Sequence, residues 1–176
     1  GYLDHRKREE LMLSRVAERI FWMARYLERA ENSARLVNAY FQTILDLPRD
    51  LEPGWDLLLD ITESRDRYLT NYTVLNERNI VKFLLADDWN PGSVSFCIKA
   101  ARENSRTARE VLTPALWEEL NELHHFIQDH AHDATTRRLR FKFLQQVIQK
   151  CQQITGLIEN VICRTQGYRF LTLGRH

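Results

Sequence analysis

The first third of the chain contains one long run of apolar residues at helical spacing. Apolar side chains recur there in alternating steps of three and four residues, without interruption: Val16, Ile20, Met23, Leu27, Ala30, Ala34, Val37, Phe41 and Ile44. This spacing places all of them on one face of an α-helix. The pattern predicts a helix over Ser14–Asp46, on the order of 50 Å long.

Shorter amphipathic segments follow, separated by clusters of proline, glycine and polar residues. Two of these segments predict helices over Trp55–Leu69 and Asn76–Ala86. Asn90 and Thr113 are each followed directly by proline, and this order is typical of a helix cap and the first helical residue. We therefore expect one helix to begin after Asn90 and another to run from Thr113 to about Gln128.

The second half of the chain contains two more apolar stripes. The stripe after Asn90 has small residues in its middle: Val94, Ile98, Ala101, Ser105, Ala108 and Leu112. A later stripe predicts a helix over Arg137–Arg164, with Leu144, Val147, Cys151, Ile154, Ile158 and Val161 facing inward. Gly167 is expected to end this region, and a further helix is expected to begin near Tyr168.

These elements together indicate the fold class. No segment shows the alternating pattern of a β-strand, and 6 Gly and 4 Pro are few for a β-sandwich of this length. Long helices joined by short loops predict an all-α antiparallel bundle of about six helices, followed by the start of another.

Composition limits the function classes. The net charge of +1 and the absence of an apolar run of about 18 residues argue against a nucleic-acid partner and a membrane span. The basic run 137–142 is a weak nucleic-acid alternative. The three cysteines form no C-x-x-C pair, which suits the reducing cytoplasm and indicates no zinc or disulfide framework.

Polar residues form a second stripe beside the apolar stripe of the first helix. Its members are Arg25, Glu28, Asn32 and Arg35, flanked by Arg29 and Glu31. The helix after Asn90 repeats the theme with Arg102, Glu103 and Arg106. If the two helices are neighbours, Glu28 and Glu31 could supply carboxylates to the arginines of the other helix.

Three interpretations of this Arg/Glu face remain open. The first is a solvated surface of weak salt bridges. The second is a partly buried network that fixes the register of the helices. The third is a groove that binds an anionic ligand or a peptide.

Metal binding is the enzymatic alternative. Glu122 and His125 form a Glu-x-x-His segment, and Glu119 lies one turn before Glu122 on the same predicted helix. Helical bundles of the di-iron type use such segments, although they use two of them together with two further glutamates. A divalent transition metal in this region would indicate a metal-dependent enzyme, whereas the simpler interpretation is an exposed polar helix end.

Several segments, in this order along the chain, resemble the bacterial alpha-E family, an all-helical family with a Glu-Arg motif. They are WMARYLERAENSARL (22–36), NPGSV (90–94), ARENSR (101–106), WEELN (117–121), GYRFL (167–171) and LGR (173–175). Glu28 and Arg29 match the Glu-Arg pair of the family name. The family has no agreed catalytic residues, so none is assigned here.

The resemblance also implies a domain organisation. Family members are usually longer and have a second Glu-Arg segment, and residues 169–176 are similar in character to residues 19–26. We therefore expect a charged N-terminal extension over 1–11, a helical bundle over 12–166 and the start of a second repeat over 167–176. An apolar helix face left uncovered in this form predicts a homo-oligomer.

The resemblance implies an accessory role. Members of the family are typically encoded beside ATP-grasp-like peptide ligases and transglutaminase-like proteins. We therefore expect a non-catalytic interaction or scaffold domain without its own cofactor, which serves such a partner in the synthesis or modification of a peptide. The absence of a glycine-rich phosphate loop indicates that any ATP is bound by the partner.

Overall fold

The computed structural model describes the backbone of residues 1–173 and the side chains of residues 1–164. Within this part all regular secondary structure is helical and there is no strand, which confirms the predicted fold class. The α-helices are α1 (Tyr2–Asp46), α2 (Leu57–Ile61), α3 (Arg65–Leu69), α4 (Glu77–Leu85), α5 (Val94–Thr107), α6 (Pro114–His130) and α7 (Arg137–Leu173). Two short 3₁₀ helices, η1 (Arg49–Leu51) and η2 (Asp133–Thr135), lie in the connections.

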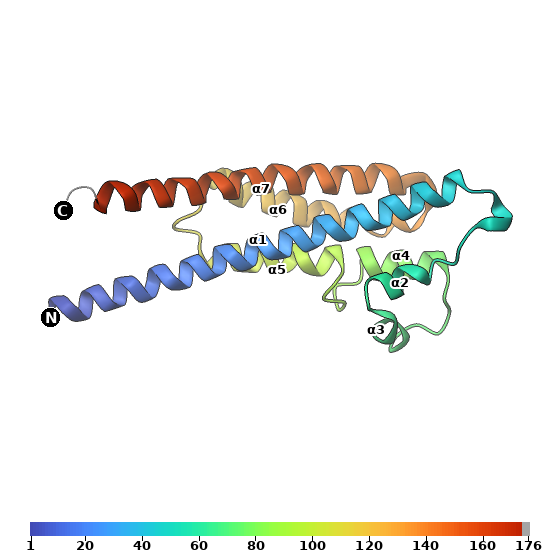
Figure 1. The fold of residues 1–176 in the computed structure, drawn as a ribbon, viewed down its shortest axis with the longest axis horizontal. Coiled ribbons are helices and arrows are strands. Elements are labelled where there is room, and N and C mark those ends of the chain that lie inside the picture. The colour runs from blue at the N-terminus through green and yellow to red at the C-terminus, as the bar shows by residue number, and fades with distance from the viewer. Residues whose placement is uncertain (174–176) are drawn as a thin grey trace.

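Four long helices, α1, α5, α6 and α7, form the antiparallel bundle (Figure 1). Helix α1 runs in the opposite direction to both α5 and α7, and α6 runs antiparallel to the same two helices. The most extensive interhelical packing is between α1 and α5, followed by α1 with α7. The small helices α2, α3 and α4 gather at the end of the bundle where α1 ends and α7 begins.

The predicted apolar stripes form the core. Every member of the α1 stripe is buried except Val16, which is partly buried. All members of the two later stripes are buried as well, including Ala108 and Leu112, which lie beyond the end of α5. Ala30 and Ala34 of α1 and Ala101 of α5 have no exposed surface. Small side chains at these positions allow two helix backbones to approach closely.

Helix α1 begins earlier than its apolar pattern predicts. It starts at Tyr2 rather than Ser14, so residues 2–13 continue the helix as exposed turns. Asp4 pairs with Arg8 at 3.2 Å, and His5 pairs with Glu9 at 3.4 Å, one turn apart in each case. Such pairs support a helix locally without any buried face, which is why the apolar pattern did not reveal these turns.

The predicted helix over Trp55–Leu69 is wrong, because a break divides it into α2 and α3. Thr62 Oγ1 donates a hydrogen bond to the Leu58 carbonyl oxygen at 2.7 Å and lies 2.6 Å from Ser64 Oγ. Between these two residues, Glu63 adopts a positive φ of 52°. A residue in this left-handed region cannot continue a right-handed helix, so the chain turns here.

Two other predicted boundaries also differ. Ser93, rather than Asn90, caps α5, because its Oγ accepts a hydrogen bond from the Phe96 backbone N–H at 3.0 Å. The boundary predicted at Gly167 is wrong, since α7 continues through it to Leu173 and no separate helix begins near Tyr168. A glycine inside a helix costs only about 1 kcal/mol. Residues 174–176 of the predicted second repeat lie outside the described residues.

A buried arginine closes the end of the bundle where α7 begins. Arg140 has no exposed side-chain surface, and its guanidinium donates to the carbonyl oxygens of Ala134 at 2.9 Å and Thr135 at 3.0 Å. The same group lies over the rings of Phe41 and Trp55, with 4.6 and 5.2 Å to the centroids. Arg140 therefore anchors η2 and α7 to the end of α1. Because it is buried, it cannot contact a nucleic acid, in contrast to the alternative that the basic run 137–142 offered.

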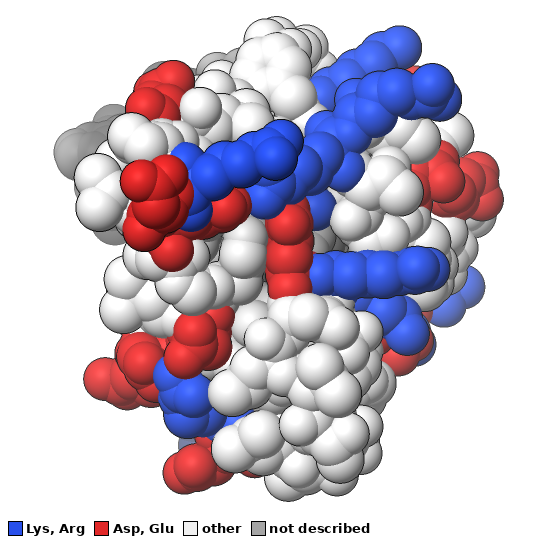
Figure 2. Space-filling view, turned by 90° about the vertical axis from the view of Figure 1, so that its right-hand side faces the viewer, with Lys and Arg blue, Asp and Glu red and all other residues white. Residues whose placement is uncertain are grey.

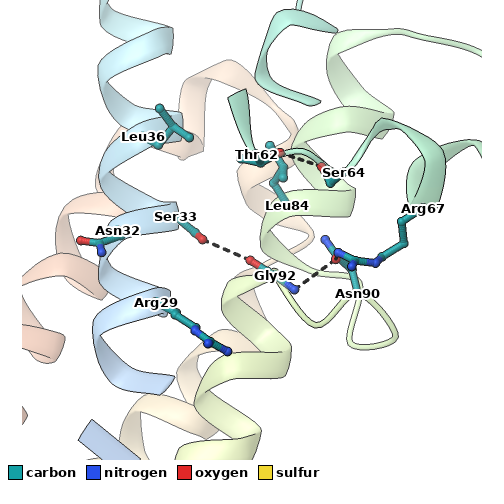
Figure 3. A pocket seen from close by; sticks show the side chains of 10 residues that line it. All are labelled: Arg29, Asn32, Ser33, Leu36, Thr62, Ser64, Arg67, Leu84, Asn90 and Gly92. Atoms are coloured by element: carbon teal, nitrogen blue, oxygen red, sulfur yellow. Dashed lines mark hydrogen bonds between the residues drawn. The ribbon is translucent and has the colours of Figure 1, made fainter. Parts of the chain in front are cut away.

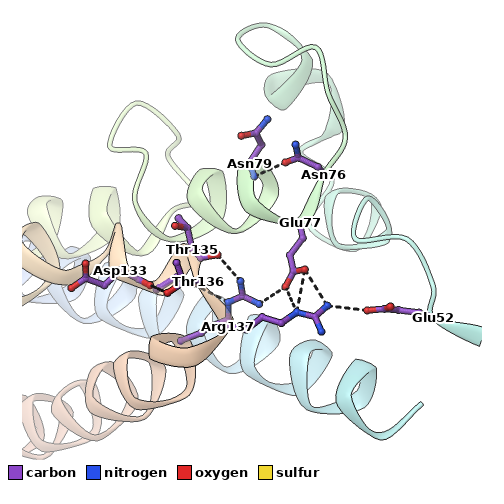
Figure 4. Close-up of polar contacts among 10 residues, drawn as sticks. Glu52, Asn76, Glu77, Asn79, Asp133, Thr135, Thr136 and Arg137 are labelled. Carbon is purple, nitrogen blue, oxygen red and sulfur yellow. Dashed lines mark hydrogen bonds and ion pairs between the residues drawn. The ribbon is translucent and has the colours of Figure 1, made fainter. Parts of the chain in front are cut away.

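Charged partners around Arg140 complete this closure, and Figure 4 labels Glu77, Arg137 and Glu52 among the residues of the network. Glu77, the first residue of α4, accepts from Arg140 Nη1 at 2.7 Å and from Arg137 Nε at 2.9 Å. Arg137 Nη2 also donates to Glu52 at 3.0 Å. The end-on view shows positive and negative side chains interleaved on this face rather than a patch of one sign (Figure 2). The network therefore fixes the start of α4 against the start of α7.

Candidate functional site

The predicted polar face of α1 consists largely of ion pairs within the helix. Arg25 Nη1 lies 2.8 Å from Glu28 Oε2, and Arg35 Nε lies 3.0 Å from Glu31 Oε2. Both arginines and Glu28 are exposed, whereas the Glu31 side chain is only 22% exposed. This arrangement matches the solvated-surface interpretation, in which each pair contributes well under about 1 kcal/mol.

The arginines of α5 do not pair with the glutamates of α1. Arg102 Nε donates instead to Asn121 Oδ1 on α6 at 2.7 Å. Arg106 pairs at 3.4 Å with Glu103 of its own helix. The expectation that Glu28 and Glu31 serve these arginines is therefore wrong, although α1 and α5 are neighbours as it required.

Arg29 differs from the other charged residues of this face because it lines a pocket (Figure 3). Its guanidinium lies over the Tyr26 ring, 5.7 Å from the ring centroid. The pocket has a volume of about 290 Å³. Its lining residues come from α1, from the α2–α3 segment and from the region around the α4–α5 loop: Arg29, Asn32, Ser33, Leu36, Thr62, Ser64, Arg67, Leu84, Asn90 and Gly92.

A direct hydrogen bond joins two of the sequence motifs at this pocket. Ser33 Oγ on α1 donates to the Gly92 carbonyl oxygen in the α4–α5 loop at 3.1 Å. Ser33 belongs to the segment that contains Glu28 and Arg29, and Gly92 belongs to the Asn-Pro-Gly-Ser segment. The fold therefore brings two segments that are 59 residues apart into one wall of the pocket.

Asn90 links the α4–α5 loop to α3 at this pocket. It is fully buried, and its Nδ2 donates to the Phe83 carbonyl oxygen at 3.0 Å. Its Oδ1 accepts from the Gly92 backbone N–H at 3.1 Å and from Arg67 Nη1 at 3.2 Å. Because each polar atom of this amide has a partner, Asn90 holds both the loop and the Arg67 guanidinium in place.

Arg67 is a site residue that the sequence analysis missed. It lies on the short helix α3, in no recognisable motif, and its position follows only from its contact with Asn90. Among the side chains of residues 1–164, no carboxylate lies within 4.0 Å of the guanidinium of Arg29 or Arg67. Two positive groups without a charged partner thus face one pocket, an arrangement that can bind an anion.

Aromatic side chains continue from Arg29 along α1 onto α5. Successive ring centroids lie 5.5 Å apart for Phe21 and Trp22, 6.2 Å for Trp22 and Tyr26, and 6.3 Å for Tyr26 and Phe96. We call these four residues the aromatic row. Phe21 is 56% exposed and Trp22 is 38% exposed, so one end of the row faces solvent. The positions of Phe21, Trp22 and Tyr26 off the core stripe of α1 were the signal that could have identified this surface from the sequence.

The residues of the metal hypothesis have other partners. Lys150 Nζ of α7 lies 2.9 Å from Glu119 and 3.3 Å from Glu122. His125 is exposed, while burial lowers the pKa of its neighbour His124. No three His, Cys, Asp or Glu side chains are placed to hold a metal ion within the described part of the chain. The structure therefore does not bring Glu119, Glu122 and His125 together as a metal centre.

Comparison with known proteins identifies the family. No helix in the described residues is both long and apolar enough to cross a membrane. No curated protein and no solved structure matches the chain. Residues 12–176 match the family model Alpha-E, described as a predicted alpha-helical domain with a conserved ER motif. The all-helical fold agrees with that description, and the chain belongs to the Alpha-E family.

Proposed function

We propose that this chain is a non-catalytic interaction domain that docks a partner enzyme through the aromatic row. The partner is an ATP-grasp-like peptide ligase or a transglutaminase-like protein, and the complex makes or modifies a peptide in the cytoplasm. The domain supplies binding surface and position, and the partner supplies the chemistry.

The observation that carries this proposal is the exposure of large aromatic side chains beside charged ones. Phe21 and Trp22 expose apolar surface on a rigid helix, next to the Arg25–Glu28 pair. Tryptophan, tyrosine and arginine dominate the binding energy of protein interfaces, usually where an apolar centre has a polar rim. Trp22, Tyr26 and Arg29 present this combination on one surface.

The class of partner rests on the family resemblance of the Glu-Arg segment and the segments that follow it. The cytoplasmic location is supported by the cysteines, since Cys97, Cys151 and Cys163 are all unpaired thiols. The metalloenzyme alternative is not favoured, because the carboxylates of Glu119 and Glu122 form ion pairs with Lys150.

Co-purification tests the proposal directly. The domain is co-expressed with the ATP-grasp-like or transglutaminase-like protein encoded beside its gene and is captured through a tag. We expect the partner in near-stoichiometric amount with the wild-type domain. We expect that Phe21→Ala and Trp22→Ala each weaken the complex by about tenfold or more, as hot-spot truncations do.

Phe141→Ala is the matched control, because Phe141 is a similarly exposed phenylalanine on α7, outside the aromatic row. It should leave the affinity unchanged. Failure of both partner classes to bind the wild-type domain would reject the proposed function. Binding that Phe141→Ala weakens as strongly as Phe21→Ala would reject the aromatic row as the docking surface.

A further inference from the structure

The pocket beside Gly92 has features that the docking proposal does not use. Arg29 reaches it from α1, and Arg67 reaches it from α3 on the far side of the loop (Figure 3). Neither guanidinium has a carboxylate within 4.0 Å among the side chains of residues 1–164, unlike Arg25, Arg35 and Arg65. Arg29 and Arg67 therefore bring positive charge to this pocket that no neighbouring carboxylate among the side chains of residues 1–164 neutralises.

We propose that this pocket binds the oxyanion of a small ligand, a carboxylate or a phosphate, between Arg29 and Arg67. Guanidinium groups present parallel N–H donors that match two oxygens of either anion. The volume of about 290 Å³ accommodates a small molecule or a single chain terminus. The site shares Arg29 with the docking surface, where this residue lies over the Tyr26 ring, but anion binding does not require a partner protein.

The polar atoms around the arginines leave them as the principal donors. Ser33 Oγ already donates to Gly92, and Thr62 Oγ1 already donates to Leu58. The amide of Asn90 is fully engaged as well, including its bond to Arg67 Nη1. Anion binding therefore depends on the guanidinium groups, whereas the neutral groups around them fix the shape of the pocket.

The surroundings of the two arginines also favour a negative charge. Helix α5 begins at Val94, directly after Gly92 and its capping Ser93, so the positive end of the helix lies beside the pocket. The asparagine contact restrains Arg67 before a ligand arrives, which reduces the entropy lost on binding. Leu36 and Leu84 line the same pocket and offer apolar contact to the remainder of the ligand.

NMR titration of the purified domain tests the site. The probes are inorganic phosphate and N-acetyl-leucine, with the uncharged N-acetyl-leucinamide as the reference compound. We expect saturable shifts of the Gly92 and Ser33 amide signals with one or both anions and none with the amide. A response to N-acetyl-leucine alone identifies a carboxylate site, and a response to phosphate alone identifies a phosphate site.

Three variants complete the experiment. Arg29→Gln and Arg67→Gln remove one charge each from exposed side chains, and each should weaken anion binding by about tenfold or more. Arg106→Gln is the control, because Arg106 is an exposed arginine of α5 outside the pocket, and it should bind as the wild type does. Absence of saturable binding by either anion would overturn the proposal. So would equal weakening by Arg106→Gln, and so would affinity unchanged in both pocket variants.

Discussion

Arg140 and Glu77, 63 residues apart in the chain, form an ion pair of 2.7 Å in which the arginine side chain has no exposed surface. The pair joins the first turn of α7 to the first residue of α4. Burial lowers the pKa of Arg140, and the Glu77 carboxylate partly offsets that effect. The charge of Arg140 therefore depends on its partner far more than a surface charge would.

Removal of one partner should be costly. We expect Glu77→Ala to lower the free energy of unfolding by about 3 kcal/mol, because it leaves a buried guanidinium without a counter-charge. Equilibrium urea unfolding monitored by circular dichroism measures the change. Glu103→Ala, which removes an exposed partner of Arg106, should change stability by less than about 0.5 kcal/mol. A loss below 1 kcal/mol for Glu77→Ala, about what a surface pair is worth, would contradict a buried role for this carboxylate.

The same carboxylate should give the domain an acid sensitivity. Burial alone would raise the pKa of Glu77, but hydrogen bonds from Arg137 and Arg140 outweigh it and hold the pKa below the ordinary value of 4.5. The unfolded chain then binds a proton more readily, so this stabilisation is complete above the ordinary value and is lost as pH falls through the folded pKa. We expect urea midpoints below pH 4.5 to fall more steeply for the wild type than for Glu77→Gln. Parallel pH profiles would show that Glu77 does not contribute.

Asn90 should matter for stability as well as for the pocket. Asn90→Ala removes three hydrogen bonds at a fully buried position and leaves the Phe83 carbonyl oxygen without its side-chain donor. We expect a loss of about 2–3 kcal/mol in the free energy of unfolding. Ser33→Ala, which removes one hydrogen bond to the same loop, should cost about 1 kcal/mol. Similar values for the two variants would contradict the central position of Asn90.

Periodicity predicted the bundle because long helices repeat one buried face many times. The α1 stripe from Ile20 to Ile44 is buried at every position. With so many repeats, a single polar residue in the stripe would not have changed the prediction of a helix. The break between α2 and α3 depends instead on one residue, Glu63, in a left-handed conformation. Glutamate carries no signal for such a conformation, in contrast to glycine, so a continuous helix was the natural prediction.

The three cysteines should differ in reactivity. Burial raises the pKa of the Cys97 thiol to about 11 and that of the Cys151 thiol to about 12, whereas Cys163 is exposed. We expect maleimide labelling of the native protein to modify only Cys163 within minutes, because thiolate and access are both required. Intact mass with and without urea measures the number of labels, and Cys163→Ser should abolish native labelling. Early modification of Cys97 or Cys151 would show that the α5–α7 core opens readily.

The exposed turns of α1 should support self-association. Met12 and Leu13 are 61% and 52% exposed, and the segment 4–10 carries both basic and acidic side chains. Two copies can therefore pair these turns in antiparallel orientation with opposite charges facing each other. We expect a dimer in multi-angle light scattering at micromolar concentration, and a monomer for Leu13→Asp. A wild-type monomer under these conditions would contradict the expectation of a homo-oligomer.

Site residues were predictable only where they share a helix face with many others. Asn32 was found because it belongs to the polar stripe of α1, and Arg29 because it flanks that stripe, and both line the pocket. Arg67 lies on a five-residue helix in a different part of the chain, and only the tertiary fold brings it to the pocket. A spacing pattern cannot reveal such a partner, because the contact depends on the turn at Glu63 that places α3.

The length of α1 makes it a molecular ruler. Tyr2 and Arg29 lie on one uninterrupted helix, about 40 Å apart at 1.5 Å per residue. A molecule bound to the first turns of α1 is therefore held at a fixed distance and a fixed angle from the arginine pocket. Insertion of a single residue between these points would rotate one against the other by about 100°. The spacing of α1 is thus a measurable constraint on the size and shape of any assembly in which both ends take part.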